Sequence, residues 1–296
     1  MADGVAYIDG EYVPIAQARI PITDWGFLHS DATYDVAHVW KGKFFRLDAH
    51  LQRFHDNMKA LHMEVGLSRE AIQAILMQCV IRSGLQNAYV EMVATRGQPA
   101  PGSRDPRSCR NQFYAFAIPF IWVANQEQQT RGLHAHISDI QRISPSSVNP
   151  TVKNYHWLDF VMGLYQAYDQ HAETVILTDA NGYITEGPGF NVFVVQQGQL
   201  LTPQSGVLQG ITRQTVMELA CEQGLAVHET QVSTADCLGA QELFLSSTAG
   251  GIVPITRINN QPIAQGHPGP VTQQLKAAYW ESHNRKAFTM AVPYVT

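Results

Sequence analysis

The chain has 296 residues, which is enough for one large domain or two smaller ones. Charged residues make up 15% and hydrophobic residues 45% of the chain, a balance that predicts much buried surface and is compatible with a subunit interface. The formal net charge of −5 gives no reason to expect nucleic acid or an anionic membrane as a partner.

The cysteines and the lengths of the apolar runs indicate the cellular compartment in which the protein is expected. The four cysteines are widely spaced and form no Cys-x-x-Cys pair, which favours reduced thiols over a disulfide framework. The first residues show neither the basic region nor the apolar run of a secretory signal, and no apolar stretch reaches the length of a membrane span. We therefore expect a cytoplasmic protein. The cysteines are Cys79, Cys109, Cys221 and Cys237.

The first part of the chain alternates strand and helix patterns. Asp9-Gly10 between two short β-prone runs is a strong hairpin signal. Ser68 fits the N-cap of the second of two helices. The expected strands are 5–8, 12–14, 32–40, 44–47, 88–95 and 113–122, the expected helices are 49–61 and 69–83, and a loop rich in Gly, Pro and Arg covers 97–110.

A polar stretch at 124–132 is the predicted linker between a small N-terminal domain, residues 1–123, and a larger, strand-rich C-terminal domain, residues 133–296. The fold class is therefore α+β. The expected strands of the second domain are 133–138, 174–179, 190–195 and 242–246, and its helices end near Gln170, Gln223 and Lys286. In the first of these helices, apolar residues at helical spacing should form a buried stripe: Leu158, Val161, Met162, Tyr165 and Tyr168.

Lys153 stands just before that stripe and is the only lysine between Lys59 and Lys276. Its neighbours in sequence are Val152, Tyr155 and other apolar residues rather than carboxylates. Desolvation and the positive end of a helix dipole both oppose an ammonium ion, and the neutral amine is the form that attacks a carbonyl to make a Schiff base. The alternative is a lysine that packs its stem and keeps its head in water.

Glu186 ends a predicted strand and is followed by Gly-Pro-Gly-Phe. A half-buried carboxylate needs a donor or a cation, and a protonated pyridine nitrogen would serve, which would also make the ring a better electron sink. The alternative is a turn glutamate in solvent.

Two clusters of small residues could bind an anion. Gly210-Ile211-Thr212 stands at a predicted helix start, where free backbone N–H groups favour a phosphate; a simple helix cap is the alternative. The run 246–251 is rich in Ser, Thr, Ala and Gly and follows a predicted strand; an ordinary glycine turn is the alternative. Arg53 could clamp the same phosphate, or be a surface arginine.

The twelve histidines do not predict a metal site. His134 and His136 share one face of a predicted strand, but no third ligand with zinc spacing is near, and the chain has no His-Glu-x-x-His motif.

Together, the lysine, the glutamate, the two anion cradles and the arginine fit a pyridine aldehyde that bears a phosphate. The chain resembles the fold-type IV pyridoxal-phosphate aminotransferases in four motifs that occur in the family's order, at 151–154, 185–191, 206–213 and 247–251. The resemblance implies the two-domain fold of that family, pyridoxal 5′-phosphate (PLP) as cofactor and a homodimer with the active site at the interface.

The resemblance also implies roles for single residues. Lys153 is implied as the Schiff-base lysine and proton shuttle, Glu186 as the partner of the pyridine nitrogen, and Leu208 as a residue that packs on the ring. The implied cofactor-binding set is Arg53, Lys153, Glu186, Leu208, Gly210, Ile211, Thr212, Thr248 and Ala249.

Within the family, the segments 29–36, 39–48 and 90–97 resemble those of (R)-selective amine transaminases. This resemblance implies transfer of an amino group from an (R)-configured primary amine to pyruvate or a similar keto acid by a ping-pong mechanism. Arg104, on the loop 97–110, would meet the keto acid's carboxylate and swing away when an apolar amine binds. The implied substrate-binding set is His29, Tyr34, Val36, Tyr89, Glu91, Arg104, Trp157, Thr248 and Ala249.

Three other functions remain open. A D-amino acid or branched-chain amino acid aminotransferase would prefer α-amino acids to simple amines, and an enzyme like aminodeoxychorismate lyase would release pyruvate instead of exchanging amino groups. A non-catalytic cofactor carrier is disfavoured by the presence of both Lys153 and Glu186, because a carrier has no need of an electron sink.

Overall fold

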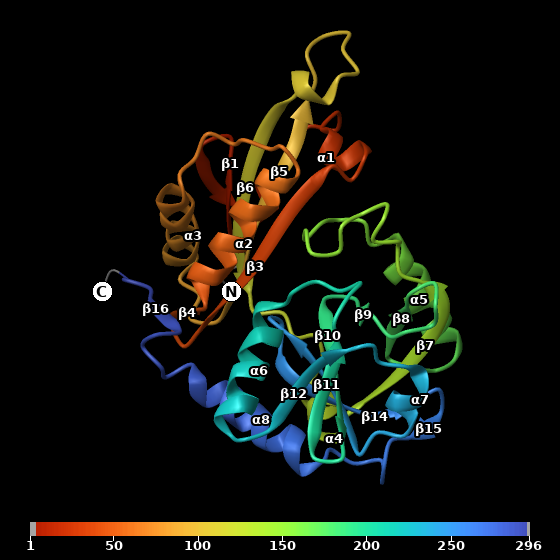
Figure 1. Ribbon diagram of the computed structural model, residues 1–296. Coiled ribbons are helices and arrows are strands. Elements are labelled where there is room, and N and C mark those ends of the chain that lie inside the picture. The colour runs from red at the N-terminus through yellow and green to blue at the C-terminus, as the bar shows by residue number, and fades with distance from the viewer. Residues whose placement is uncertain (1–3, 295–296) are drawn as a thin grey trace. The chain divides into compact units, whose positions relative to one another are not determined.

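A computed structural model describes residues 4–294, and the chain divides into two compact units (Figure 1). The first unit contains the described residues up to Ile121, the short segment Val152–His156 and the described residues from His283 onward. The second unit contains Trp122–Thr151 and Trp157–Ser282. The units therefore do not follow one linear division of the chain. The stretch 124–132 lies in the second unit and contains a short helix, α4 (Gln126–Arg131).

The first unit is built on a seven-stranded antiparallel sheet with the order β16-β4-β3-β5-β6-β1-β2. Two helices, α2 (Leu47–Ala60) and α3 (Arg69–Ser83), cover one face (Figure 1). The strands are β1 (Val5–Ile8), β2 (Glu11–Pro14), β3 (Ala32–Trp40), β4 (Lys43–Phe45), β5 (Ala88–Gln98), β6 (Arg110–Pro119) and β16 (Thr289–Ala291), and a short helix α1 (Trp25–Leu28) precedes β3.

The alternation of side chains along β3 gives this unit two different sheet faces. Ala37 and Val39 belong to the apolar core under α2 and α3. Because successive side chains of a strand point to opposite faces, Tyr34, Val36 and His38 lie on the other face, and these three are also buried. A half-buried antiparallel strand would expose one of its faces, whereas β3 is buried on both.

The second unit contains a nine-stranded mixed sheet. Its main path is β12-β11-β10-β13-β14-β7-β8, with β15 paired to β14 and β9 paired to β10. The strands are β7 (Leu133–Gln141), β8 (Thr174–Thr178), β9 (Glu186–Gly187), β10 (Phe190–Gln196), β11 (Gln199–Pro203), β12 (Ala226–Thr230), β13 (Glu242–Ser247), β14 (Gly251–Ile258) and β15 (Gln261–Pro262). The helices besides α4 are α5 (Leu158–Asp169), α6 (Ile211–Glu222), α7 (Thr234–Leu238) and α8 (Pro270–Ser282). The α+β prediction is confirmed.

The face of α5 that packs on the sheet differs from the predicted one. The packed face carries Phe160 and two small residues, Gly163 and Ala167. A Cβ on Gly163 would lie 2.9 Å from Cδ2 of Leu177. Gly163 and Ala167 therefore let α5 approach β8 closely. The predicted buried stripe is wrong, because its five large apolar residues are exposed by 39% to 74% in this chain: Leu158, Val161, Met162, Tyr165 and Tyr168.

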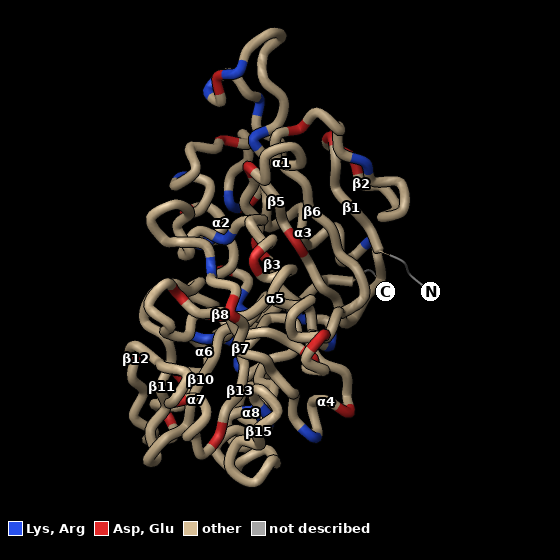
Figure 2. Tube along the Cα trace, turned by 90° about the vertical axis from the view of Figure 1, so that its right-hand side faces the viewer, with Lys and Arg blue, Asp and Glu red and all other residues tan. Residues whose placement is uncertain are grey.

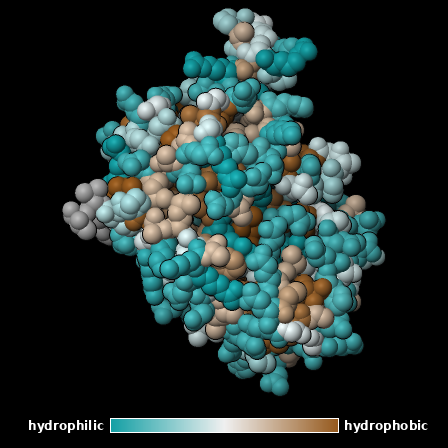
Figure 3. All heavy atoms as spheres, turned by 60° about the vertical axis from the view of Figure 1, so that its left-hand side comes forward, coloured by the Kyte–Doolittle hydropathy of each residue, from teal (hydrophilic) through white to brown (hydrophobic). Residues whose placement is uncertain are grey.

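The surface has no strong charge segregation. Acidic and basic residues are scattered along the trace (Figure 2), and hydrophilic residues cover most of the face shown in Figure 3, with apolar residues between them. None of the helices within residues 4–294 is long and apolar enough to cross a bilayer.

Candidate active site

Lys153 lies in a segment of the first unit that pairs with β3. A backbone bridge joins Thr33 to Asn154. The carbonyl oxygen of Lys153 accepts hydrogen bonds from Oγ1 of Thr33 at 2.6 Å and from the backbone N–H of Tyr34 at 3.3 Å. Because α5 begins only at Leu158, the expected position of Lys153 at a helix N-terminus is wrong. Strand β3 fixes its backbone instead.

The amine of Lys153 lies over an aromatic ring. Its Nζ is 4.1 Å from the centre of the Tyr34 ring, and the ring of Tyr155 stacks on Tyr34 with a centroid distance of 4.2 Å and an interplanar angle of 9°. The face of an aromatic ring attracts a cation, so Tyr34 offers an attractive contact to this side chain when it is charged. The amine must lose its proton before it attacks a carbonyl.

Glu91 is a buried carboxylate beside this cluster, on β5 and only 8% exposed. The hydroxyl of Tyr155 donates a hydrogen bond to its Oε1. Burial raises the pKa of Glu91, although the hydrogen bond from Tyr155 and the charge of Lys153 oppose the rise. Burial and the neighbouring Glu91 also raise the pKa of Tyr155, so that its hydroxyl keeps the proton that it donates.

Four of the predicted substrate-binding residues share one face of the first unit's sheet. Val36 pairs with Glu91 and His38 with Tyr89 in the β3–β5 register, and residues two apart on a strand point the same way. Tyr34, Val36, Tyr89 and Glu91 therefore form one wall on the face opposite α2 and α3.

The other five predicted substrate contacts lie elsewhere, and Thr248 and Ala249 among them belong to the turn between β13 and β14. His29 is exposed at the end of α1, where it packs edge-on against Trp25 with a centroid distance of 4.7 Å. Arg104 is exposed on the loop that joins β5 to β6, which carries both basic and acidic residues (Figure 2). Trp157 belongs to the second unit and packs edge-on against Phe160, with a distance of 5.5 Å between the ring centroids.

Arg53, predicted as a phosphate ligand, is held by a buried acid. Its Nε donates to Oδ2 of Asp35 at 2.7 Å and its Nη2 to Oδ1 at 2.9 Å, and Nδ1 of His50 lies 2.7 Å from the same carboxylate. Burial alone would raise the pKa of Asp35, but Arg53 and His50 lower it well below its usual range. This bidentate pair sets the direction of the guanidinium from α2.

In the second unit, Glu186 is 5% exposed and sits at the start of β9. Its Oε2 accepts a hydrogen bond from the backbone N–H of Leu208 at 2.9 Å, and its Oε1 accepts one from Nε of Arg142 at 3.3 Å. Arg142 also pairs with Asp159 at 2.6 Å and lies 4.2 Å from the ring centre of Phe160. These donors explain how a carboxylate can be buried at this position.

The loop before α6 is shaped around Gly210. A Cβ on Gly210 would lie 2.3 Å from Oδ1 of Asn191, and Nδ2 of Asn191 donates to the carbonyl of Leu208 at 2.9 Å. Gly210 is the N-cap of α6 and makes no side-chain cap. Ile211 and Thr212, the first residues of α6, therefore follow a tightly packed glycine. Free N–H groups at a helix N-terminus favour a bound anion.

The turn that joins β13 to β14 contains Thr248 and Ala249, which were predicted to contact both phosphate and substrate. Some of its backbone groups already form hydrogen bonds within the protein. The N–H of Ala249 donates to Oγ of Ser247 at 3.2 Å, and its carbonyl accepts from the N–H of Val123 at 2.6 Å. Oγ of Ser247 in turn donates to the carbonyl of Gly189 at 2.8 Å, which ties the turn to the Gly-Pro-Gly bend after Glu186.

Four residues of these networks were missed by sequence reasoning: Tyr155, Arg142, Asp35 and Asn191. A signal existed for Arg142, because it is the only Lys or Arg between Arg131 and Lys153 and it ends an apolar strand pattern. Tyr155 stands two residues after Lys153. Its contacts with Tyr34 and Glu91 depend on long-range strand pairing, which no local pattern indicates.

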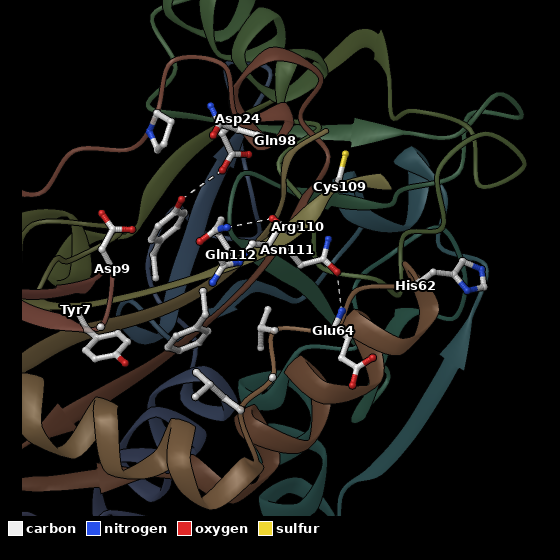
Figure 4. A pocket seen from close by; sticks show the side chains of 17 residues that line it. Tyr7, Asp9, Asp24, His62, Glu64, Gln98, Cys109, Arg110, Asn111 and Gln112 are labelled. Carbon is white, nitrogen blue, oxygen red and sulfur yellow. Dashed lines mark hydrogen bonds between the residues drawn. The ribbon is translucent and has the colours of Figure 1, made fainter. Parts of the chain in front are cut away.

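A large hollow in the first unit holds none of the predicted site residues (Figure 4). It has a volume of about 1060 Å³ and is lined among others by Asp9, Asp24, Glu64 and Asn111. Asp24 accepts hydrogen bonds from Thr95 and Tyr114, and Asn111 accepts one from the N–H of Glu64. Asp24 and Asn111 thus use their oxygens within the protein, and we assign the hollow no chemistry. No cluster of metal-binding side chains occurs within the described part of the chain.

Comparison with known proteins identifies the protein family. Residues 32–258 match the family described as Amino-transferase class IV. A putative branched-chain-amino-acid aminotransferase of Methanocaldococcus jannaschii is 31% identical over 276 residues, which cover 92% of this chain and 94% of the relative.

Solved structures of branched-chain aminotransferases have the same fold as this chain. The branched-chain amino acid aminotransferase of Escherichia coli superposes with a TM-score of 0.91 at 25% identity, covering 98% of this chain and 99% of that one. The enzyme of the same name from Thermobaculum terrenum, solved in its PLP form, gives a TM-score of 0.87 at 25% identity and covers 99% of both chains.

Proposed function

The chain belongs to the class IV aminotransferases, which have the fold-type IV architecture and use PLP, and we propose that it moves an amino group from an (R)-configured primary amine to pyruvate or a similar keto acid. The amine class rests on the buried Glu91, and the handedness on the resemblance of segments 29–36 and 90–97 to (R)-selective enzymes. The aminotransferase activity itself follows from the family.

The residues present fit PLP. Lys153 supplies a primary amine for the aldehyde, and Glu186 supplies a carboxylate for the pyridine nitrogen. The glycine-shaped start of α6, with Thr212, supplies backbone donors and a hydroxyl for the phosphate. We propose that Arg53, Leu208, Ile211, Thr248 and Ala249 complete this cofactor set.

The chemistry divides between cofactor and protein. When bound, PLP supplies the electron sink that stabilises negative charge at the carbon bearing the substrate's amino group. Nζ of Lys153 would form the covalent attachment to PLP and would take up and return the proton of that carbon. The carboxylate of Glu186 would hold the proton on the pyridine nitrogen, and Arg142 and the N–H of Leu208 keep that carboxylate in place.

Glu91 is the observation that favours a simple amine. It is a carboxylate on the same wall as Tyr34 and Val36, close enough to Lys153 for the two charges to interact. A substrate carboxylate placed against this wall would meet a like charge in a poorly solvated place, which is unfavourable. An amine with two uncharged substituents has no such conflict. We propose that the four wall residues, together with His29 and Trp157, shape the amine's pockets.

A branched-chain amino acid aminotransferase is the second candidate. The names of the similar proteins favour it. Under this alternative, the substrate's carboxylate would bind away from Glu91.

Steady-state kinetics with two donor pairs separates the candidates. We expect kcat/KM for (R)-1-phenylethylamine with pyruvate to exceed that for L-leucine with 2-oxoglutarate by at least about tenfold, because one avoided like-charge contact in a buried site contributes roughly 1.4 kcal/mol or more. The (S)-amine serves as the control for handedness. A preference for L-leucine would establish the second candidate, and release of pyruvate without amino exchange would indicate a lyase.

We also propose that the protein is a homodimer. The exposed apolar face of α5 is larger than is usual for a solvent-exposed surface, since it presents five large side chains on one short helix. Light scattering with size-exclusion chromatography should give twice the chain mass of 32.9 kDa. A monomer at micromolar concentration would contradict the proposal, and Tyr165→Glu should weaken the dimer if α5 lies in the interface.

A further inference from the structure

The ring of Tyr34 lies between two side chains of one short segment. Nζ of Lys153 is 4.1 Å from the ring centre, and the ring of Tyr155 lies 4.2 Å away and nearly parallel. Two groups that close to one ring centre cannot share a face of the ring, so the amine and the second ring lie on opposite faces. Lys153 and Tyr155 thus clamp Tyr34 between them.

The spacing of the clamp follows from the backbone. Lys153 and Tyr155 stand on either side of Asn154, the one residue of this segment in a β-bridge, and Tyr155 itself lies in a bend. The bridge between Thr33 and Asn154, and the hydrogen bonds to the carbonyl of Lys153, hold this segment to the strand that carries Tyr34.

A buried acid holds one side of the clamp. The Tyr155 hydroxyl donates to Oε1 of Glu91, which is 8% exposed. Hydrogen bonds to a charged acceptor are short and directional, so the Tyr155 ring has little freedom to turn away from Tyr34. Glu91 is itself paired across the sheet with Val36, which places it on the wall that also carries Tyr34.

We propose that Tyr155 is a positioning residue for Lys153: Glu91 holds its hydroxyl, and its ring braces Tyr34 against the lysine's side chain. The proposal rests on the proposed function, in which Lys153 carries PLP. Tyr155 acts through Tyr34 and Lys153, not by contact with the reacting atoms. Holding an amine near its target converts a random encounter into a first-order step, which is where a positioning residue has its effect.

The test measures covalent attachment, not turnover. Apo-protein is mixed with saturating PLP, and growth of the yellow band gives the first-order rate constant for attachment. Borohydride reduction followed by peptide mass spectrometry identifies the modified lysine. The rate is read at its alkaline plateau, where the amine is neutral in every variant, so that the contact between the amine and the Tyr34 ring no longer affects the fraction that can react.

Four variants isolate the clamp. Tyr155→Leu removes the brace, and we expect attachment to slow about tenfold. Tyr155→Phe keeps the ring and loses the bond to Glu91, and should slow it two- to fourfold. Tyr34→Leu removes the central ring and should resemble Tyr155→Leu. Because both act through one clamp, the double variant Tyr34→Leu/Tyr155→Leu should be no slower than either single variant.

The matched control is Tyr183→Leu, which makes the same chemical change at the turn after β8 in the second unit. Its attachment rate should equal that of the unmodified protein. Circular dichroism checks that each variant is folded; if Tyr155→Leu is not, Tyr34→Leu and Tyr155→Phe test the same clamp.

Two results would overturn the inference. Rates within twofold of the unmodified protein for Tyr155→Leu and Tyr34→Leu would show that the clamp does not position the amine. If the slowing in the double variant equals the product of the two single effects on the attachment rate, the two tyrosines act separately. If borohydride traps no PLP on Lys153 even in the unmodified protein, the proposed function fails first, and that outcome is distinguishable from the other two.

Discussion

Nε of Arg142 lies 3.3 Å from Oε1 of Glu186. The same guanidinium is 2.6 Å from Asp159, so one half-buried cation serves two carboxylates, of which Glu186 is buried and Asp159 half-buried. The shorter ion pair is with Asp159, and Glu186 also accepts a hydrogen bond from the N–H of Leu208.

Replacement of Arg142 should cost stability. Arg142→Met would leave the buried Glu186 and the half-buried Asp159 without their shared cation, and breaking a buried ion pair costs roughly 3–5 kcal/mol. We expect the free energy of unfolding in urea to fall by about that amount at neutral pH. Arg142→Lys retains the charge and serves as the control, with a smaller loss. A loss below about 1 kcal/mol in Arg142→Met would mean that the two acids reach water.

Gly210→Ala tests the proposed phosphate site. The backbone of Gly210 has a φ of −65°, which alanine adopts freely, so any effect comes from the added methyl group. That methyl group would lie 2.3 Å from Oδ1 of Asn191 and must displace Asn191 or the start of α6. We expect the Kd for PLP to rise at least about tenfold, equal to roughly 1.4 kcal/mol, with an unchanged circular dichroism spectrum. Unchanged affinity would place the phosphate elsewhere.

Glu91 should make stability fall as pH rises. Burial raises its pKa above the usual value near 4.5, so ionisation is harder in the folded state than in the unfolded chain. Below pH 4.5 the acid is neutral in both states and imposes no cost. As pH rises through the raised pKa, the unfolded state gains by ionising first and the folded state loses stability.

Glu91→Gln should remove this dependence. The difference in unfolding free energy between Glu91→Gln and the unmodified protein, measured in urea from pH 4.5 to pH 8, should grow in favour of the variant as pH increases. The amide keeps an oxygen that can accept the hydrogen bond from Tyr155. A difference that does not change over this range would show that Glu91 ionises normally in the folded protein.

Arg104 should matter for only one half-reaction. It lies on an exposed loop, where a guanidinium can approach a carboxylate and retreat to water, whereas a fixed buried arginine would be left unpaired beside an apolar amine. Arg104→Ala should raise KM for pyruvate at least about tenfold more than KM for the amine. Arg107→Ala, on the same loop but paired with Asp105, is the control. Equal changes in both KM values would count against this role.

The sequence predicted most strands and helices of the first unit because their signals are local. The Asp9-Gly10 hairpin and the Ser68 cap both appear as expected, the latter with Oγ accepting from the N–H of Ala71 at 3.2 Å. Other features depend on tertiary contacts. A helical pattern cannot say which of two apolar faces is buried, and on α5 the small residues Gly163 and Ala167 pack while large ones face outward.

The same limit applies to the candidate site. The motifs marked Lys153 and Glu186, yet the surroundings of Lys153 are set by pairing with a strand about 120 residues earlier in the chain, through Thr33 and Tyr34. Local reasoning placed the lysine at a helix N-terminus and did not predict the aromatic ring of Tyr34 beside its amine. Arg142 and Tyr155 were missed for the same reason, since their roles exist only once distant strands are adjacent.

The most direct test of the account is the visible spectrum of the purified protein with PLP, before and after (R)- or (S)-1-phenylethylamine. We expect a yellow band that the (R)-amine bleaches, that the (S)-amine leaves unchanged and that pyruvate restores, with borohydride trapping PLP on Lys153. A band that responds only to L-leucine or D-alanine would keep the family and overturn the proposed substrate. The absence of a band, or trapping on another lysine, would contradict the role of Lys153 on which the account depends.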